Sequence, residues 1–183
     1  MKPIVVYSSQ TGFTEKYAKW ISEALGCEAI PLKQAKKTDL LSYDLVIYGG
    51  WCCAGSVNNL KWILDKVPSL VENNQKFLVF AVGGSPIENP DLAEGLSNIS
   101  NKIKEKLPKN TIDESIFKLV YCPGGFNYEK MGKGSKIMMK MFLSMLKSNK
   151  NKTQKDEEMI KMISSSYDIS DKKYIEPILA FAK

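Results

Sequence analysis

Short runs of β-branched and aromatic residues alternate with longer helical patterns along most of this 183-residue chain. This alternation constrains the fold more than any other feature, because it is typical of a parallel sheet covered by helices on both faces. The expected strands cover residues 4–8, 28–32, 45–49, 76–82 and 117–122. Right-handed crossovers between them predict an α/β doubly wound open sheet, in which ligands bind outside the carboxyl ends of the strands.

Helical patterns fill the intervals between these strands. The first, at 13–25, carries a regular apolar stripe and is followed by Gly26, which predicts its end. Further helices are expected at 58–67, 91–107, 136–147, 156–164 and 172–182, with a lysine-rich linker at 148–155. We interpret residues 1–183 as one domain, in which a basic, methionine-rich insertion or extension covers about 126–165.

Hydroxyl side chains and a glycine occupy the turn between the first strand and the first helix. A dianion at this turn can be held by the N–H groups of the first helical turn, by the helix dipole and by hydroxyls. The chain contains no arginine, so lysine is the only cationic side chain that could assist. The sequence therefore predicts a phosphate site at Ser9, Gln10, Thr11, Gly12, Phe13 and Thr14.

Two other loops follow expected strands and consist mainly of small residues, which let the backbone approach a ligand closely. Trp51 is a candidate to stack on a flat ring system, and the alternative is that it covers the top of the core. The adjacent thiols in the same loop are candidates for redox exchange, although cysteine is commonly a small buried hydrophobe. The candidate ligand residues are Gly50, Trp51, Cys52, Cys53, Ala54 and Gly55 in one loop and Gly83, Gly84 and Ser85 in the other.

Several classes of protein are disfavoured by what the sequence lacks. The absence of histidine removes nucleophile systems with an imidazole base, and the absence of arginine removes cysteine phosphatases. The four cysteines have no C-x-x-C spacing, so we expect no metal site and no disulfide framework. No G-x-G-x-x-G follows the first strand, and no run reaches the ~18–20 apolar residues of a membrane span. Without an apolar signal segment, the expected location is the cytoplasm.

The first loop resembles the phosphate-binding loop of the flavodoxins, Thr/Ser-x-Thr-Gly-x-Thr, which grips the phosphate of flavin mononucleotide (FMN). Residues 43–51 are similar to the third strand of that family and the start of the loop beside the isoalloxazine ring. The resemblance covers most of residues 1–125 and implies a flavodoxin-like five-stranded parallel sheet of order 2-1-3-4-5, with FMN as the cofactor. It further implies a flavoprotein oxidoreductase that acts in electron transfer with a redox partner protein or a small-molecule electron donor or acceptor. No nucleic-acid partner is expected. The loop at 83–85 lacks the aromatic that many flavodoxins place there, which implies one-sided stacking.

The C-terminal third differs from small flavodoxins. Residues 130–161 hold nine lysines and three acidic residues, so this segment carries the +6 net charge of the whole chain. Its arrangement resembles the menaquinone-dependent, flavodoxin-type protoporphyrinogen oxidases. Its amphipathic helix either packs on the sheet or docks on a membrane, a porphyrin or a protein partner, and peripheral membrane contact through 130–161 is one expectation.

Three functions stay open at this point. They are electron transfer to a protein partner, an FMN-dependent enzyme resembling protoporphyrinogen oxidase or quinone reductase, and a binding module whose flavin site has decayed. No catalytic residue is predicted, although Tyr121 and Tyr128 are candidates for either proton donation or a structural role.

Overall fold

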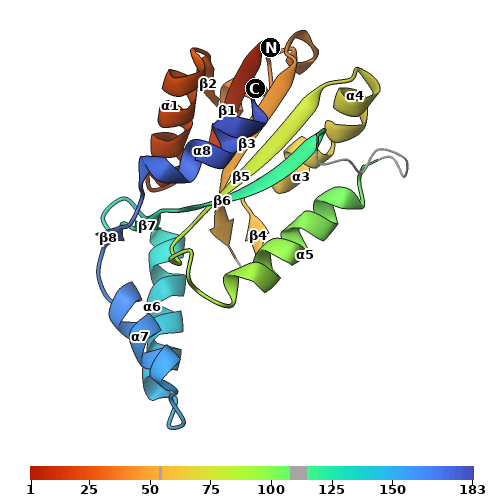
Figure 1. Cartoon of the computed structure of the whole chain (residues 1–183). Helices are drawn as coiled ribbons and strands as arrows, with labels where there is room; N and C mark the ends of the chain where they lie inside the picture. Colours follow the sequence, from red (N-terminus) through yellow and green to blue (C-terminus); the bar gives the residue numbers. More distant parts are fainter. Residues whose placement is uncertain (54, 108–114) are drawn as a thin grey trace.

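The computed structural model describes residues 1–53, 55–107 and 115–183. Its main sheet, drawn in Figure 1, contains five parallel strands in the order β2-β1-β3-β5-β6. These strands are β1 (Pro3–Ser8), β2 (Glu28–Pro31), β3 (Leu45–Cys53), β5 (Lys76–Gly83) and β6 (Phe117–Pro123). Apart from the short β4, which pairs only with β3, this is the predicted order 2-1-3-4-5, so the predicted fold is confirmed.

The remaining elements connect and cover these strands. The helices are α1 (Phe13–Leu25), α2 (Leu32–Ala35), α3 (Leu60–Leu64), α4 (Val67–Glu72), α5 (Leu92–Lys104), α6 (Lys133–Ser148), α7 (Gln154–Ile163) and α8 (Glu176–Phe181). Single 3₁₀ turns form η1 (Leu40–Ser42) and η2 (Lys172–Ile175). Two short antiparallel pairs complete the structure, since β4 (Ser56–Val57) pairs with β3, and β7 (Gly125–Phe126) pairs with β8 (Tyr167–Asp168).

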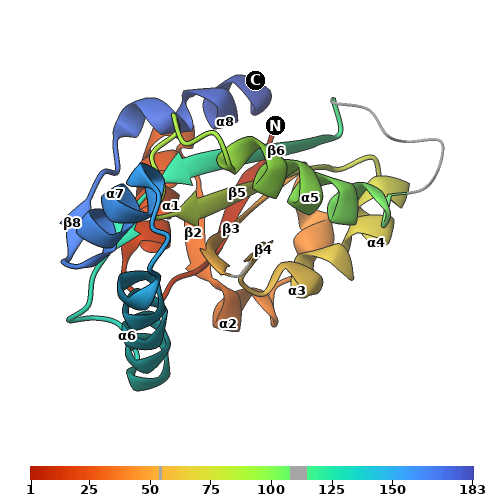
Figure 2. The same cartoon turned by 90° about the horizontal axis from the view of Figure 1, so that it is seen from below.

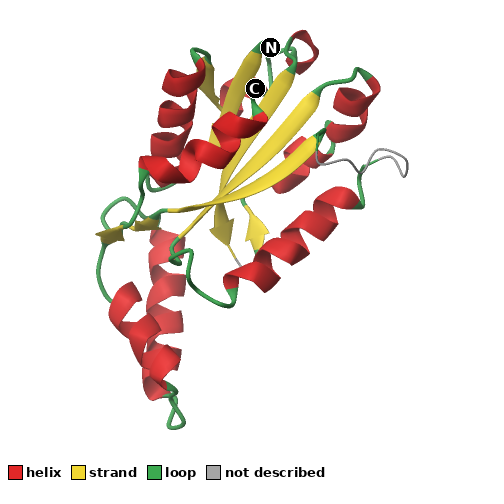
Figure 3. Ribbon diagram, in the orientation of Figure 1, coloured by secondary structure: helices red, strands yellow, loops and turns green. Residues whose placement is uncertain are grey.

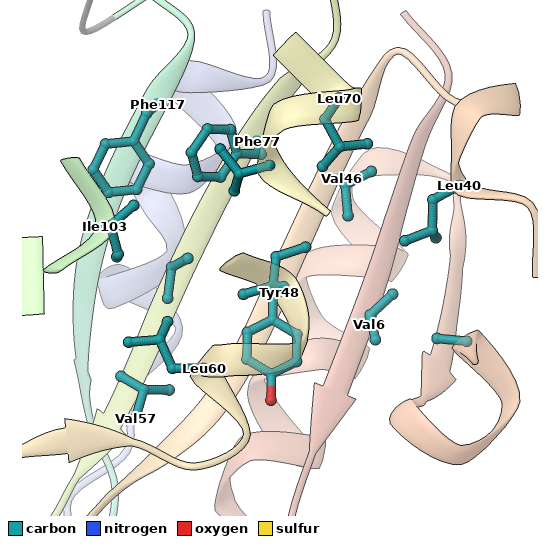
Figure 4. Packing of buried hydrophobic residues seen from close by; sticks show 14 of the residues in the cluster. Val6, Leu40, Val46, Tyr48, Val57, Leu60, Leu70, Phe77, Ile103 and Phe117 are labelled. Carbon is teal, nitrogen blue, oxygen red and sulfur yellow. The ribbon is translucent and has the colours of Figure 1, made fainter. Parts of the chain in front are cut away.

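The two faces of the sheet bury different residues of the same strands, because successive side chains of a strand point to opposite faces. On one face, Val5 and Ile47 pack with Tyr17 and Ile21 of α1 and with Ile178 of α8. On the other, helices α3, α4 and α5 cover the sheet, as Figure 2 shows from below. Figure 4 shows this second cluster, which includes Val6, Val46, Tyr48, Leu60, Leu70, Phe77, Ile103 and Phe117.

Two predicted helices illustrate how far local sequence determines local structure. Helix α1 has the predicted bounds, and Gly26 ends it with a φ of 62°. The single helix predicted at 58–67 is wrong, because the structure forms two short helices in its place. Asn59 takes a left-handed φ of 54°, so α3 begins only after it, and α4 starts separately at Val67 with Pro68 in its first turn.

Helices α6 and α7 form a hairpin that projects beyond the carboxyl ends of the strands (Figures 1 and 3). The hairpin is attached to the sheet by the β7–β8 pair. Its helices begin two or three residues before the predicted starts, and the chain then returns to the sheet, where α8 packs beside α1. In the described part of the chain, no helix has the length and apolar character needed to cross a bilayer.

Candidate functional site

The turn after β1 places the N-terminus of α1 at the carboxyl edge of the sheet. Gly12 is the N-cap of α1 and has a φ of 100°, a conformation that favours glycine. Its N–H donates a 3.2 Å hydrogen bond to the Ser9 hydroxyl, which closes the turn. No side chain among the described residues caps α1 through a hydrogen bond. The positive end of this helix is therefore available to an anionic group.

The segment after residue 49 is a strand hairpin, whereas the sequence predicted a loop. Strand β3 continues to Cys53, and β4 turns back against it, pairing Cys52 with Val57. The N–H of Asn58 donates to the Trp51 carbonyl at 2.8 Å, and the Tyr48 hydroxyl donates to the Asn58 carbonyl at 2.7 Å. These bonds hold Trp51 on an ordered backbone at the end of the sheet.

A link between this hairpin and β1 involves side chains that the sequence interpretation overlooked. Ser8 donates its hydroxyl proton to the Asn58 side-chain oxygen at 2.7 Å. The amide group of Asn59 donates to the Ser8 hydroxyl at 3.0 Å. Because Ser8 precedes the first loop, the network fixes the hairpin relative to that loop. A polar pair directly before α3 was the only sequence signal.

The loop after β5 is fixed from behind by two tyrosines. Tyr121 donates its hydroxyl proton to the Ser85 carbonyl at 2.7 Å, and Tyr167 donates to the Gly84 carbonyl at 2.6 Å. A Cβ added at Gly84 would lie 2.4 Å from the Phe126 ring, so the close approach requires glycine there. Hydrogen bonds thus fix each of the three strand-end segments.

These three segments line one cavity of about 710 Å³. Gly12 and Gly50 do not line it; Gly12 borders a second cavity, and a Cβ on Gly50 would lie 2.5 Å from Val57. Ser9 supports the turn from outside the cavity, and Ala54 lies outside the described residues. The predicted residues that do line the cavity are Gln10, Thr11, Phe13, Thr14, Trp51, Cys52, Cys53, Gly55, Gly83, Gly84 and Ser85.

The opposite wall of this cavity comes from helices that the sequence interpretation did not assign to a site. It is mainly apolar and contains five methionines together with aliphatic and aromatic side chains. A cluster of six methionines between Met131 and Met159 was the signal available in the sequence. The wall includes Leu92, Leu96 and Ile99 of α5, Met131, Met138, Met139 and Phe142 at and before α6, and Met159, Met162 and Ile163 of α7.

A second cavity, of about 490 Å³, also borders the first loop. Thr11, Gly12 and Phe13 line it together with Lys16, Lys130 and Asp168. The Lys16 ammonium contacts the Asp168 carboxylate at 2.9 Å and donates to Ser170 at 2.7 Å. Burial opposes the charge of Asp168, but the hydrogen bonds from Lys16 and Ser170 outweigh it and lower the pKa of that carboxyl.

Buried phenols and thiols near the main cavity keep their protons at neutral pH. Burial raises the pKa of Tyr121 and of Tyr167, and both hydroxyls already donate to loop carbonyls. Burial, together with the neighbouring Cys53, raises the pKa of Cys52 to about 12. Tyr128 donates to the Ile163 carbonyl at the end of α7. These groups support the site structurally, and all four cysteines are free thiols.

The donor set of the main cavity suits FMN. Hydroxyls and a helix N-terminus border the cavity and provide the donors that a phosphate needs. Trp51 and the small-residue loops provide the mainly apolar surfaces that an isoalloxazine ring needs. The described residues contain no group of three or more cysteine, aspartate or glutamate side chains arranged to hold a metal ion.

Comparison with solved structures finds flavodoxins and flavoproteins at low identity. A flavodoxin from the domain Archaea is 21% identical, with a TM-score of 0.42 over 68% of this chain and 85% of its own. Flavodoxin 1 from Bacillus cereus is 16% identical, with a TM-score of 0.41 over 81% and 99%. A flavoprotein in complex with FMN from Lactobacillus acidophilus is 14% identical, with a TM-score of 0.43 over 66% and 90%.

Two comparisons use the sequence itself. The first, with curated proteins, finds no match. The family model described as "Flavodoxin domain" matches residues 4–153, which is most of the chain. The match includes the first loop, the β3–β4 hairpin and the loop after β5. The chain therefore belongs to the flavodoxin family of FMN-binding redox proteins.

Proposed function

We propose that the first loop and the first turn of α1 hold the phosphate of FMN. Gln10, Thr11 and Thr14 line the main cavity at the end where this turn lies. Their side chains and the N–H groups of α1 provide neutral donors, and the helix dipole favours the negative charge. Ser9 and Gly12 shape the turn without lining the cavity.

The isoalloxazine ring then lies between Trp51 and the loop at 83–85. Both segments line the main cavity, and the hydrogen bonds to Asn58, Tyr121 and Tyr167 fix their backbones. The loop has no aromatic of its own, but Phe126 packs against Gly84 and also lines the cavity. Trp51 and Phe126 thus each contribute an aromatic ring to the lining of this cavity.

The function that the geometry supports best is that of an FMN-dependent oxidoreductase acting on a small apolar molecule. The single observation that carries this proposal is the shared cavity, because the strand-end loops and the methionine-rich wall of α6 and α7 enclose the same space. When bound, FMN supplies one- or two-electron transfer. The chain's own residues bind the cofactor, shape the apolar space beside it and exclude water from part of it.

Quinones and porphyrinogens are the substrate classes that suit this space, because a quinone is flat and largely apolar and a porphyrinogen is a larger, puckered ring with a mainly apolar body. A protoporphyrinogen oxidase is one form of the proposal, supported by a basic, methionine-rich segment after β6. Methionine side chains are flexible and adapt to ligands of irregular shape. A quinone accepts electrons from the reduced flavin and can take its protons from water, so it requires little from a protein base, which agrees with a chain that contains no histidine.

A second candidate is an electron carrier that serves a redox partner protein. The specific observation in its favour is that the phenols beside the cavity, Tyr121 and Tyr167, hold their protons and serve as backbone supports. Simple electron transfer needs no proton donor from the protein. The two candidate functions make different demands on the cavity. An enzyme requires a small molecule to enter its apolar part, whereas an electron carrier does not.

Gly95 allows a direct test. It lines the cavity from α5, and a Cβ added there meets no atom within 4 Å, so the side chain of Gly95→Leu starts in free space and should narrow the cavity. The FMN-loaded protein is photoreduced and mixed with menadione or with cytochrome c, and flavin absorbance is followed. Gly95→Leu should slow the reaction with menadione and leave that with cytochrome c unchanged.

Gly134→Leu is the matched control, because Gly134 lies in α6, has the same free space around its Cα and does not line the cavity. Equal rates with menadione for the wild type and Gly95→Leu would contradict the enzyme proposal and favour the electron carrier. Failure of the wild type to bind FMN would contradict both.

A further inference from the structure

The outward side of α6 exposes large apolar side chains. Ile137, Met141 and Met145 are 60%, 68% and 61% exposed. They are spaced four residues apart and therefore lie along one side of the helix. Met138 and Phe142 continue this surface toward the cavity. A contiguous exposed apolar surface of this kind marks an interaction site more often than an isolated exposed residue does.

Lysines border this apolar row. Lys133, Lys140 and Lys147 recur every seven residues, which places them along one line beside Ile137, and Lys136 lies close to the same line. Lys133, Lys140 and Lys147 are exposed, and Lys136 is half-buried. The side of α6 that carries Met139, Leu143 and Leu146 is less exposed, and α6 contacts α7. Helix α6 thus has a covered side, an exposed apolar side and a basic edge between them.

The charge around α6 has a single sign. Residues 130–152 contain seven lysines and no acidic residue. The three acidic residues of the segment 130–161 belong to α7, where Asp156 forms a capping box with Thr153. Outside 130–161, the chain has 26 − 9 = 17 lysines and 20 − 3 = 17 acidic residues, so it carries no net charge there. The basic charge is concentrated on the projecting hairpin.

We propose that α6 docks in the plane of an anionic lipid bilayer, with Ile137, Met141 and Met145 in the interface and its lysines against the headgroups. An apolar row with a lysine edge is typical of interfacial helices. The charge complements anionic lipids, each lysine near such a surface adding to the attraction. The 16-residue α6 is too short to cross a bilayer, so it lies on the surface. The hairpin projects beyond the carboxyl ends of the strands (Figure 1).

This docking connects the membrane with the cavity. Met138 and Phe142 are exposed and also line the cavity, so apolar surface runs from the docking side of α6 into the space beside the flavin loops. A lipid-soluble electron acceptor could pass from the bilayer to that space without crossing water. This consequence rests on the proposed function, whereas the docking itself does not.

The test is sedimentation of the FMN-loaded full chain with vesicles. One set contains phosphatidylcholine alone, and the other contains three parts phosphatidylcholine and one part phosphatidylglycerol. We expect binding to the anionic vesicles only, and loss of binding at high salt. Lys140→Gln with Lys147→Gln should weaken the apparent affinity roughly tenfold or more. Met141→Gln with Met145→Gln should also weaken it, because the apolar contribution is lost.

Matched controls lie elsewhere on the surface. Lys36→Gln with Lys37→Gln removes the same charge from exposed positions at α2, and Leu41→Gln removes an exposed apolar side chain at η1. Both should bind as the wild type does. The proposal is overturned by absence of binding to anionic vesicles at low salt, or by equal losses in the Lys36/Lys37 and Lys140/Lys147 pairs. It is also overturned if the wild type is a dimer that Met141→Gln with Met145→Gln dissociates, because a second copy would then cover this side of α6.

Discussion

Gln10 in the first loop donates a 3.2 Å hydrogen bond from its side-chain amide to the hydroxyl of Ser135 in the first turn of α6. A Cβ added at Gly132 would lie 3.2 Å from the same amide nitrogen, so the start of α6 lies directly against the proposed phosphate loop. The hairpin and the cofactor site therefore share a boundary.

FMN binding should slow amide hydrogen exchange in the first turn of α6. The reason is that a phosphate on the first loop orders Gln10, and Gln10 holds Ser135. Exchange measured by mass spectrometry with and without FMN checks this. Ser135→Ala should reduce the effect in α6, while α8 shows none in either protein. Equal protection of α6 in Ser135→Ala would show that this bond does not transmit the effect.

Thr11→Ala combined with Thr14→Ala should weaken FMN binding much more than riboflavin binding. The two hydroxyls lie at the proposed phosphate end, and a hydrogen bond to a charged group contributes about 1.5–3 kcal/mol. The expected loss for FMN is therefore tenfold or more, measured by quenching of flavin fluorescence. Riboflavin serves as the internal control because it lacks the phosphate. An equal loss for both flavins would place the phosphate elsewhere.

Lys130 is a candidate for a cation at the phosphate. Its ammonium lies 3.9 Å from the position that a Cβ on Gly12 would occupy, and it lines the second cavity beside the first loop. Lys130→Gln should weaken FMN binding a few-fold at low salt. The difference in affinity from the wild type should shrink at high salt, because a pair formed by the Lys130 ammonium and the FMN phosphate would be exposed to solvent. Lys133→Gln, with the same charge change, should bind FMN as the wild type does. Identical affinities for the two variants would exclude a specific role for Lys130.

The sequence predicted the elements whose signals are local. The bounds of α1 followed from one apolar stripe and from Gly26, and the first loop was recognisable from its hydroxyls. The helix at 58–67 was wrong because a left-handed Asn59 and a break before Val67 depend on how the chain packs against the sheet. The β3–β4 hairpin was missed for a similar reason, since glycines and adjacent cysteines do not favour a strand.

The residues that form the wall of the main cavity could be identified only from the tertiary structure. Phe126 and Tyr167 approach the loop at 83–85 from segments 40 or more residues away in sequence, so nothing near Gly84 indicates them. The methionines of α6 and α7 were recognised as an apolar, adaptable group, but their place in the cavity that Trp51 also lines depends on where the hairpin projects. Local patterns predicted the loops of the site, and tertiary packing decided what faces them.

Cys52 should resist alkylation in the folded protein at neutral pH. Burial and the neighbouring Cys53 thiol raise its pKa to about 12, so its thiolate fraction at neutral pH is very small. As long as the pH is below about 12, each increase of one pH unit raises that fraction tenfold. Because the folded pKa exceeds the unfolded one, this group's contribution to stability is present below about pH 9 and is lost as the pH rises towards 12. Iodoacetamide labelling followed by peptide mass spectrometry measures the rate, and labelling in urea is the control. Similar rates in both conditions would contradict a raised pKa of this partly buried thiol in the folded protein.

The same substitution should have opposite effects at two glycines. Gly49 lies in β3 opposite Phe80 of β5, and a Cβ there would be 1.9 Å from the ring of Phe80, which is fully buried. Gly49→Ala should therefore lower the free energy of unfolding by about 3 kcal/mol or more. Gly95→Ala, in α5 with free space around it, should raise that free energy by about 0.5–1 kcal/mol because alanine favours the helix. Urea denaturation followed by circular dichroism measures both, and similar midpoints for the two variants would mean that Phe80 does not occupy the space above Gly49.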